Sequence, residues 1–280
     1  MTVDRDEMVE AKGMRTVAKL MDLRGRRALI TGGAGHIGSA VGETLIDLGS
    51  TVAILDLDIR ACEKQAQLFN RGRPGSAYPF SCDLRDERRT RLVINKVIEE
   101  MGGLDILVHC AAYVGTTQDP GWAVPFEEQT VAAWEDATRV NLTSVFVMIQ
   151  EAKKALSESG LGSVILFSSI YGFVGPDLRL YDGTEMANPV GGAASKGGLI
   201  QLTRYFATTL APRVRVNAIS AGGVRRNQPN VFQERYVART PLGRMAREED
   251  MKGAVAYLAS DLSAYVTGHN LVVDGGWTAW

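Results

Sequence analysis

The chain has 280 residues, of which 45% are hydrophobic and 22% are charged, so it can bury a substantial core and is not expected to be disordered. Its 31 basic and 32 acidic residues give a net charge of −1, without the basic excess that is typical of nucleic-acid-binding proteins. No apolar run approaches the roughly 20 residues that span a bilayer, and the opening residues carry charges instead of an apolar signal segment. Three scattered cysteines suit neither a disulfide framework nor a zinc site. We therefore expect a cytoplasmic protein with no nucleic acid, no membrane and no metal among its partners.

The predicted elements alternate between short β-branched runs and helical stretches, the pattern of a parallel sheet covered by helices on both faces. Residues 1–22 precede the first strand and are expected to form an appended, partly helical arm. The expected strands are residues 27–31, 51–56, 77–82, 106–109, 163–168, 214–218 and 270–274. The clearest helix is predicted over residues 131–156, where apolar residues recur at helical spacing. No linker interrupts residues 23–280, so we predict a single α/β domain with a doubly wound parallel sheet of seven strands.

Three long connections, residues 112–130, 169–190 and 219–249, follow the carboxyl ends of predicted strands. Doubly wound sheets bind their ligands at this edge, and long loops there are more often functional than accidental. We therefore expect residues 169–190 and 219–249 to form substrate loops.

The first predicted strand leads into Thr-Gly-Gly-Ala-Gly-His-Ile-Gly at residues 31–38 and then into a helix. Missing side chains let the backbone approach a pyrophosphate, and the helix N-terminus favours its negative charge. Asp56 ends the second strand, where a carboxylate can accept hydrogen bonds from both ribose hydroxyls and would repel the 2′-phosphate of NADP. A glycine turn without a ligand and a solvated Asp are the simpler alternatives, but the order of strand, glycines, helix and Asp56 favours an NAD site.

From about residue 23 to residue 280, the chain resembles the classical size class of the short-chain dehydrogenase/reductase family. Asp83-Leu84 matches the pair that contacts adenine in the family, and residues 109–112 stand where the family usually has Asn-Asn-Ala-Gly. The segments 167–169 (Phe-Ser-Ser), 215–220 (Arg-Val-Asn-Ala-Ile-Ser) and 273–276 (Val-Asp-Gly-Gly) are also characteristic. The glycine spacing is nearer that of the family's extended branch, and the last residues resemble members linked to bacterial surface-sugar biosynthesis.

The resemblance implies a Rossmann fold with NAD as the cofactor. It also implies a small-molecule substrate and a homotetramer or, next, a homodimer, paired through the helices at residues 131–156 and 192–210 and through the aromatic tail at residues 277–280. Together with the glycine turn, it assigns the cofactor contacts to Gly32, Gly35, His36, Ile37, Gly38, Asp56, Leu57, Asp83, Leu84, Cys110, Ala111, Ala112, Asn141, Lys196, Ala221, Gly222 and Val224. The turn at residues 220–224 lacks the proline that the family usually has there but keeps its glycines.

In the family, a tyrosine transfers the proton, a lysine four residues later lowers its pKa and holds the nicotinamide ribose, a serine orients the substrate oxygen, and a helix asparagine anchors a water chain. Ser169, Asn141 and Lys196 match the serine, asparagine and lysine. Outside this family pattern, a turn serine, a helix-capping asparagine and a surface lysine would be the simpler interpretations. Gly192 stands where the tyrosine is expected, and its hydrogen cannot transfer a proton.

Tyr181 is the obvious substitute for the missing tyrosine, although Glu185 and not a lysine lies four residues beyond it. A packing or substrate-wall role for Tyr181 is the alternative, and Tyr171 and His109 are weaker candidates. We expect a water-accessible gap where Gly192 replaces a phenol. Two functions stay open: an NAD-dependent oxidoreductase that interconverts a secondary alcohol and a ketone, or a cofactor-binding pseudo-enzyme or inactivated variant of one.

The predicted loop at residues 219–249 contains six arginines between positions 225 and 247 and one acidic residue, Glu234. Arginine suits phosphate or carboxylate recognition, which would fit an anionic, phosphorylated or nucleotide-linked sugar. A solvated basic face or salt bridges between subunits is the alternative that we favour.

Overall fold

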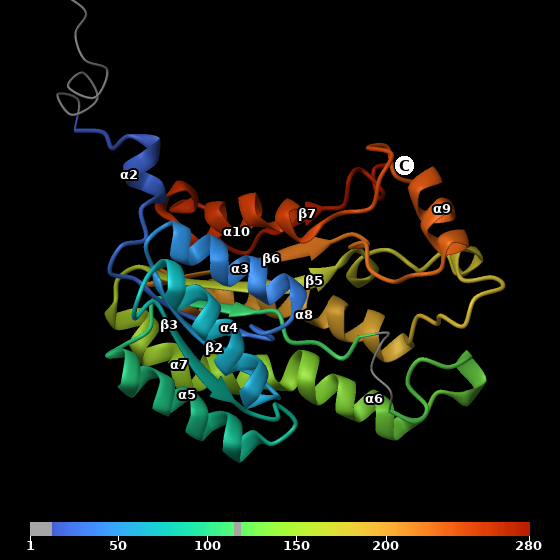
Figure 1. Cartoon of the computed structure of the whole chain (residues 1–280), viewed down its shortest axis with the longest axis horizontal. Helices are drawn as coiled ribbons and strands as arrows, with labels where there is room; N and C mark the ends of the chain where they lie inside the picture. The colour runs from blue at the N-terminus through green and yellow to red at the C-terminus, as the bar shows by residue number, and fades with distance from the viewer. Residues whose placement is uncertain (1–12, 115–118) are drawn as a thin grey trace, which may run out of the picture.

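The computed structural model describes residues 13–114 and 119–280 and contains one sheet of seven parallel strands (Figure 1). The strands are β1 (Arg27–Thr31), β2 (Thr51–Asp56), β3 (Ala77–Ser81), β4 (Ile106–His109), β5 (Gly162–Ser169), β6 (Val214–Ala221) and β7 (Asn270–Val273). Their order is β3-β2-β1-β4-β5-β6-β7, so the chain winds outwards in both directions from the boundary between β1 and β4. The predicted doubly wound fold is confirmed.

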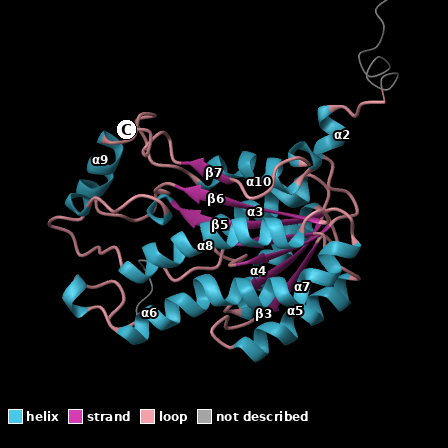
Figure 2. Cartoon of the chain, turned by 180° about the vertical axis from the view of Figure 1, so that it is seen from behind, coloured by secondary structure: helices cyan, strands magenta, loops and turns pink. Residues whose placement is uncertain are grey.

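Helices cover both faces of the sheet, as Figures 1 and 2 show from opposite sides. They are α2 (Val17–Met21), α3 (His36–Asp47), α4 (Ile59–Gly72), α5 (Glu87–Met101), α6 (Val131–Thr138), α7 (Ser144–Glu158), α8 (Val190–Leu210), α9 (Asn230–Ala238) and α10 (Lys252–Ala259). Successive strand residues point to opposite faces, which makes two cores. Leu29 and Leu107 pack with α5, α7 and α8, whereas Ile30 and Val108 pack with α3, α4 and α10.

The helix predicted over residues 131–156 is interrupted. A π-helical segment, η2 (Arg139–Thr143), separates α6 from α7, and Asn141 is completely buried within it. The prediction of one regular helix was wrong at this point. Such insertions often mark functional positions, because they redirect one side chain without ending the helix.

The expected N-terminal arm is described only from residue 13, and its residues 1–12 lie outside the described residues. The Thr16 hydroxyl caps α2 by accepting a hydrogen bond from the backbone N–H of Lys19 (3.2 Å). Arg15 from the arm and Arg26 from the domain both pair with Asp261, at 2.5 and 2.6 Å. The described part of the arm is therefore attached to the domain.

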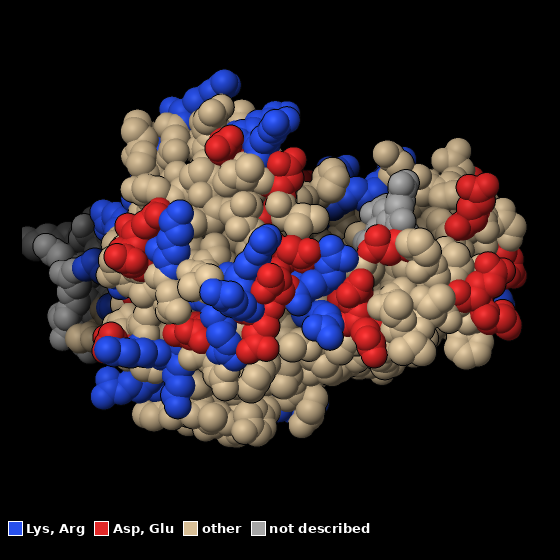
Figure 3. All heavy atoms as spheres, turned by 90° about the horizontal axis from the view of Figure 1, so that it is seen from below, with Lys and Arg blue, Asp and Glu red and all other residues tan. Residues whose placement is uncertain are grey.

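The surface carries charges of both signs. On the face shown in Figure 3, basic and acidic side chains are interspersed. Arg91 of α5 pairs with Glu87 one turn before it and with Glu151 of α7, so part of this charge is neutralised between neighbouring helices. Within residues 13–114 and 119–280, no helix is long and apolar enough to cross a membrane.

Candidate active site

The carboxyl ends of the central strands place the predicted site segments side by side (Figure 1). Thr31 of β1 is in register with His109 of β4, and Ser169 of β5 is in register with Ala221 of β6. The strand β6 was predicted to end at residue 218, and in the structure it continues three residues further, to Ala221. The glycine turn, the segment after β4, the candidate catalytic serine and the turn after β6 therefore share one edge of the sheet.

The glycine turn between β1 and α3 is packed too closely for side chains. A Cβ on Gly32 would lie 2.7 Å from the backbone nitrogen of Ala111, and one on Gly38 would lie 2.0 Å from the carbonyl oxygen of Gly32. Gly32 also has a φ of +64°, which glycine adopts without strain. Gly35 precedes His36, the first residue of α3, and both are exposed at the helix N-terminus. The turn thus offers bare backbone and a helix N-terminus, as a dinucleotide pyrophosphate requires.

Asp56 lies beside this turn at the end of β2. Its carboxylate accepts hydrogen bonds from the backbone N–H groups of Ala34 (3.1 Å) and Leu57 (2.8 Å). These contacts orient a partly exposed carboxylate next to the glycine turn, where the sequence analysis expects the adenosine ribose.

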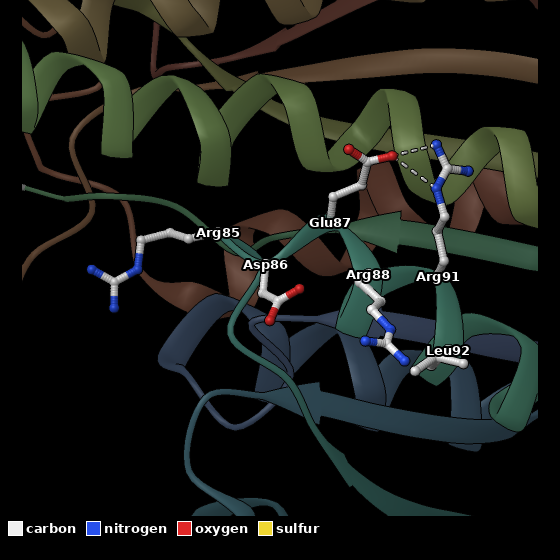
Figure 4. A pocket seen from close by; sticks show the side chains of 6 residues that line it. All are labelled: Arg85, Asp86, Glu87, Arg88, Arg91 and Leu92. Atoms are coloured by element: carbon white, nitrogen blue, oxygen red, sulfur yellow. Dashed lines mark hydrogen bonds and ion pairs between the residues drawn. The ribbon is translucent and has the colours of Figure 1, made fainter.

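The predicted adenine pair is divided between the surface and the core. Leu84 is buried, whereas Asp83 is hydrogen-bonded to Arg85 (2.8 Å), which lowers the pKa of Asp83. The residues after this pair line a surface hollow of about 610 Å³ that Figure 4 shows from close by. It is lined by Arg85, Asp86, Glu87, Arg88, Arg91 and Leu92. None of the candidate catalytic residues lines the hollow, so we do not assign it to the reaction.

Ser169 and Lys196 both lie at the end of β5. The Ser169 hydroxyl oxygen accepts a hydrogen bond from the backbone N–H of Tyr171 (3.2 Å), which leaves the hydroxyl hydrogen available to a ligand. The Nζ atom of Lys196 donates to the carbonyl oxygen of Phe167 (2.7 Å). Burial lowers the pKa of Lys196 to about 8, because its surroundings disfavour the charged form.

Asn141 connects three parts of the site. Its Oδ1 atom accepts a hydrogen bond from the backbone N–H of Tyr113 (2.7 Å), and its Nδ2 atom donates to the hydroxyl of Ser195 (2.9 Å). The π-helical segment therefore fixes the loop after β4 to the helix that carries Lys196.

His109 and Cys110 lie beneath this network. The Nδ1 atom of His109 is 2.8 Å from the Thr31 hydroxyl, and burial, followed by the nearby charge of Lys196, lowers the pKa of His109 to about 3. A histidine that is neutral at physiological pH and completely buried is a poor proton donor to a substrate. Burial raises the pKa of the Cys110 thiol, so the thiolate is disfavoured.

Gly192 lies in the first turn of α8, one helical turn before Lys196. A Cβ there would contact only Trp122, at 3.6 and 3.8 Å, which are ordinary van der Waals distances. Trp122 is buried, and its Nε1 atom donates to the carbonyl oxygen of Val114 (2.8 Å). The expected gap is thus bounded on one side by the ring of Trp122. The sequence analysis missed Trp122, because no motif marks it within the connection 112–130.

Tyr181 belongs to an aromatic cluster. It follows η4 (Leu178–Leu180), its hydroxyl lies 3.3 Å from that of Tyr171, and its ring packs against Phe232. Burial raises the pKa of both tyrosines. Among the described residues, no hydrogen bond joins the Tyr181 hydroxyl to Ser169 or Lys196. This arrangement favours the packing alternative for Tyr181.

The turn after β6 is enclosed by the second predicted substrate loop. The backbone N–H of Gly222 donates to Val273 at the end of β7 (3.0 Å), and that of Gly223 donates to the hydroxyl of Tyr236 on α9 (2.5 Å). Ala221 is buried, and Val224 forms a parallel bridge with Ala246. The glycines here make room for β7 and Tyr236.

Most arginines of the loop at residues 219–249 are bonded within the chain. Arg235 donates to the backbone oxygens of Leu180 and Asp182. The ion pairs are Arg226–Glu248, Arg239–Asp177, Arg244–Asp250 and Arg247–Glu249. In the part of the chain that the structure describes, Arg225 is the one of the six whose guanidinium makes no such contact. Intrachain salt bridges therefore account for most of this basic segment.

The described residues contain no group of His, Cys, Asp and Glu side chains placed to hold a metal ion.

A family model described as enoyl-(acyl carrier protein) reductase matches residues 32–278. Cis-4-hydroxycyclohexanecarboxylate dehydrogenase of Sinomonas cyclohexanicum is 34% identical over 259 residues, which are 91% of this chain and 97% of that protein.

Solved structures agree with these matches. A short chain dehydrogenase from Leptospira borgpetersenii with bound NAD+ is 31% identical, with a TM-score of 0.79, and the match covers 95% of this chain and 96% of that one. A gluconate 5-dehydrogenase from Burkholderia cenocepacia in complex with NADP and tartrate is 25% identical, with a TM-score of 0.80, over 95% and 100% of the two chains.

Proposed function

Because the chain belongs to the short-chain dehydrogenase/reductase family, we propose that it is an NAD(H)-dependent oxidoreductase acting on a secondary alcohol or ketone of a polar, sugar-like substrate. The observation that carries the cofactor assignment is the Asp56 carboxylate, held by two backbone N–H groups beside the glycine turn. A negative charge there accepts ribose hydroxyls and disfavours the 2′-phosphate of NADP. Similar structures contain either NAD+ or NADP, so family membership alone does not identify the cofactor, and the assignment depends on Asp56.

The residues present fit a dinucleotide. Bare backbone at Gly32 and Gly38 would receive the pyrophosphate, and Asp56 would bind the adenosine ribose. Lys196, whose Nζ atom donates to the carbonyl oxygen of Phe167, would also hold the nicotinamide ribose. When bound, the nicotinamide supplies the acceptor or donor of a hydride.

The chain itself contributes orientation and electrostatics to the reaction. Ser169 can donate its free hydroxyl hydrogen to the substrate oxygen, which polarises a carbonyl. Asn141 and Ser195 hold the helix that positions Lys196. Gly192 has no side chain that could carry the proton. We propose that the proton is instead exchanged directly with water beside Lys196, which is a slower route.

The substrate is proposed to be polar, and the gluconate 5-dehydrogenase among the similar structures supports a sugar-like compound. Because the loop arginines are mostly paired within the chain, a neutral polyol is favoured over a phosphorylated sugar. A cytoplasmic location and a homotetramer or homodimer complete the proposal.

Gly192 supports a second candidate: a cofactor-binding pseudo-enzyme. The two functions separate in one assay, in which NAD and a panel of polyols are added and the absorbance of reduced cofactor is followed. Cofactor binding without any reduction over hours supports the pseudo-enzyme.

The cofactor assignment is tested by calorimetric titration. We expect wild-type protein to bind NADP at least about tenfold more weakly than NAD, because Asp56 repels the added phosphate. Asp56→Ala should narrow this difference. Equal affinity of the wild type for both cofactors would contradict the assignment.

A further inference from the structure

One carboxylate beside the glycine turn has no role in the function proposed so far. Glu248 lies in η5 (Glu248–Met251), at the end of the loop 219–249. Its Oε1 atom forms an ion pair with Nη1 of Arg226 and lies 3.8 Å from Nδ1 of His36. A single oxygen thus faces basic groups from two elements that are far apart in the chain.

The backbone fixes Glu248 in this place. Val224 and Ala246 form a parallel bridge, in which the N–H of Arg225 donates to the oxygen of Ala246 (2.8 Å) and the N–H of Ala246 donates to the oxygen of Gly223 (3.0 Å). Two positions beyond the bridge on each segment, Arg226 and Glu248 face one another. Because η5 also packs against α3, the same carboxylate reaches His36.

His36 and Arg226 lie close to each other, because both contact the same oxygen of Glu248 beside the glycine turn. His36 is the first residue of α3, and its side chain is 71% exposed at the helix terminus that would receive a pyrophosphate. Arg226 is only 27% exposed, and a partly desolvated guanidinium gains more from an anion than one in open water. Its planar fork suits two phosphate oxygens as well as one carboxylate.

We infer that Glu248 competes with the pyrophosphate of the dinucleotide for His36 and Arg226, and so limits how tightly the site holds phosphate-bearing ligands. This inference rests on the proposed function, because it takes the glycine turn as the pyrophosphate site. The carboxylate keeps Arg226 ordered, but its negative charge opposes a second anion close by. Weaker binding favours release of the cofactor after each turnover.

The test compares wild type with Glu248→Gln by calorimetric titration of NAD, ADP and adenosine. We expect the affinities for NAD and ADP to rise about twofold to fivefold in the variant, the range for loss of one partly exposed charge contact. Adenosine has no phosphate, so its affinity should not change. The matched control is Glu249→Gln. It removes one negative charge at the neighbouring position, where Glu249 pairs with Arg247.

A double-mutant cycle adds the role of Arg226. Arg226→Gln should cost little NAD affinity in the wild type, where Glu248 engages the guanidinium, and should abolish the gain in the Glu248→Gln background. An equal gain for adenosine, an equal gain in Glu249→Gln, or no gain at all would overturn the inference. If wild type binds NAD but Glu248→Gln binds it no better, only the competition is wrong. If wild type binds no NAD, the proposed function is wrong as well.

Discussion

The resemblance to the family predicts a proton donor at position 192, where this chain has a glycine, and the surroundings accept a larger side chain. A Cβ there would touch Trp122 at ordinary contact distance and would meet no backbone atom. In a helix, residues four apart lie on the same face, so a side chain at 192 stands over Lys196. Position 192 therefore lacks a proton-donating group, although it has room for one.

Gly192→Tyr should raise turnover by about 100-fold or more, because general acid–base help typically contributes that much. NAD affinity should change little, since the cofactor contacts are made by other residues. Steady-state reduction of NAD with an accepted polyol measures the first effect, and calorimetry measures the second.

Tyr181→Phe in the otherwise unaltered chain is the control for that experiment. We expect it to leave the residual rate intact, because the Tyr181 hydroxyl is bonded to Tyr171. If Tyr181→Phe removes most of the activity and Gly192→Tyr adds none, the proton passes through Tyr181.

Lys196 makes stability depend on pH. Its pKa is lowered to about 8 in the folded protein, whereas an unfolded lysine titrates near its ordinary value of 10.5. Between these values the unfolded chain binds more protons, so the free energy of unfolding should rise as pH increases from 8 to 10.5. Below pH 8 the full cost of a buried charge remains.

Lys196→Met removes this dependence. We expect the stability of wild type relative to the variant to increase on the order of 2 kcal/mol between neutral and alkaline pH. Urea denaturation of both proteins over that range measures it, and the comparison cancels other groups that titrate there. A constant difference would show that the lysine is not desolvated in solution.

The sequence predicts Asp56 because it ends a strand next to a glycine turn, whereas Ser169 and Lys196 are predicted only by the resemblance to the family. The same logic cannot find Trp122 or Glu248. Both reach the site from long connections, whose path depends on tertiary packing and not on local pattern.

At the level of elements, the break between α6 and α7 shows the limit of periodicity. The apolar pattern continues through residues 139–143, so it predicts an unbroken helix. The π-helical turn is stabilised by long-range hydrogen bonds of Asn141 to Tyr113 and Ser195, which no local pattern encodes.

The two predicted substrate loops are joined to each other, and α9 provides much of that connection. Tyr236 accepts a hydrogen bond from Gly223 and stacks on Trp277, while Arg239 pairs with Asp177 of the other loop. We therefore expect the two loops to behave as one unit.

Tyr236→Phe should lower the free energy of unfolding by about 1 kcal/mol, because the N–H of Gly223 loses its acceptor. It should also speed proteolytic cleavage within residues 224–249. Tyr265→Phe is the matched control, since Tyr265 is fully exposed and lies outside these loops. Equal effects of the two substitutions would show that the bond to Gly223 does not hold the loop.

At the scale of the whole molecule, several helices carry large apolar side chains that are exposed in the single chain. Exposed apolar side chains lie on η1 (Phe126–Glu128), α6, α7 and α8. They are Phe126, Val131, Trp134, Phe146, Val190 and Tyr205. The expected contribution of the tail needs correction. Of its two tryptophans, Trp277 is buried against Tyr236 in its own chain and Trp280 is exposed.

We expect these helices to pair with a second copy of the chain, and the pairs to associate into a homotetramer. Sedimentation at micromolar concentration should then give a mass four times that of the 30.3 kDa chain. Phe146→Glu combined with Tyr205→Glu places charges on the exposed face of α7 and α8, and should shift the protein to smaller species because burying an unpaired carboxylate is costly. Leu68→Glu, at an exposed apolar position on α4, should leave the assembly unchanged. A wild-type monomer would contradict the prediction, and a dimer that the double substitution dissociates would confirm the helix pairing while excluding the tetramer.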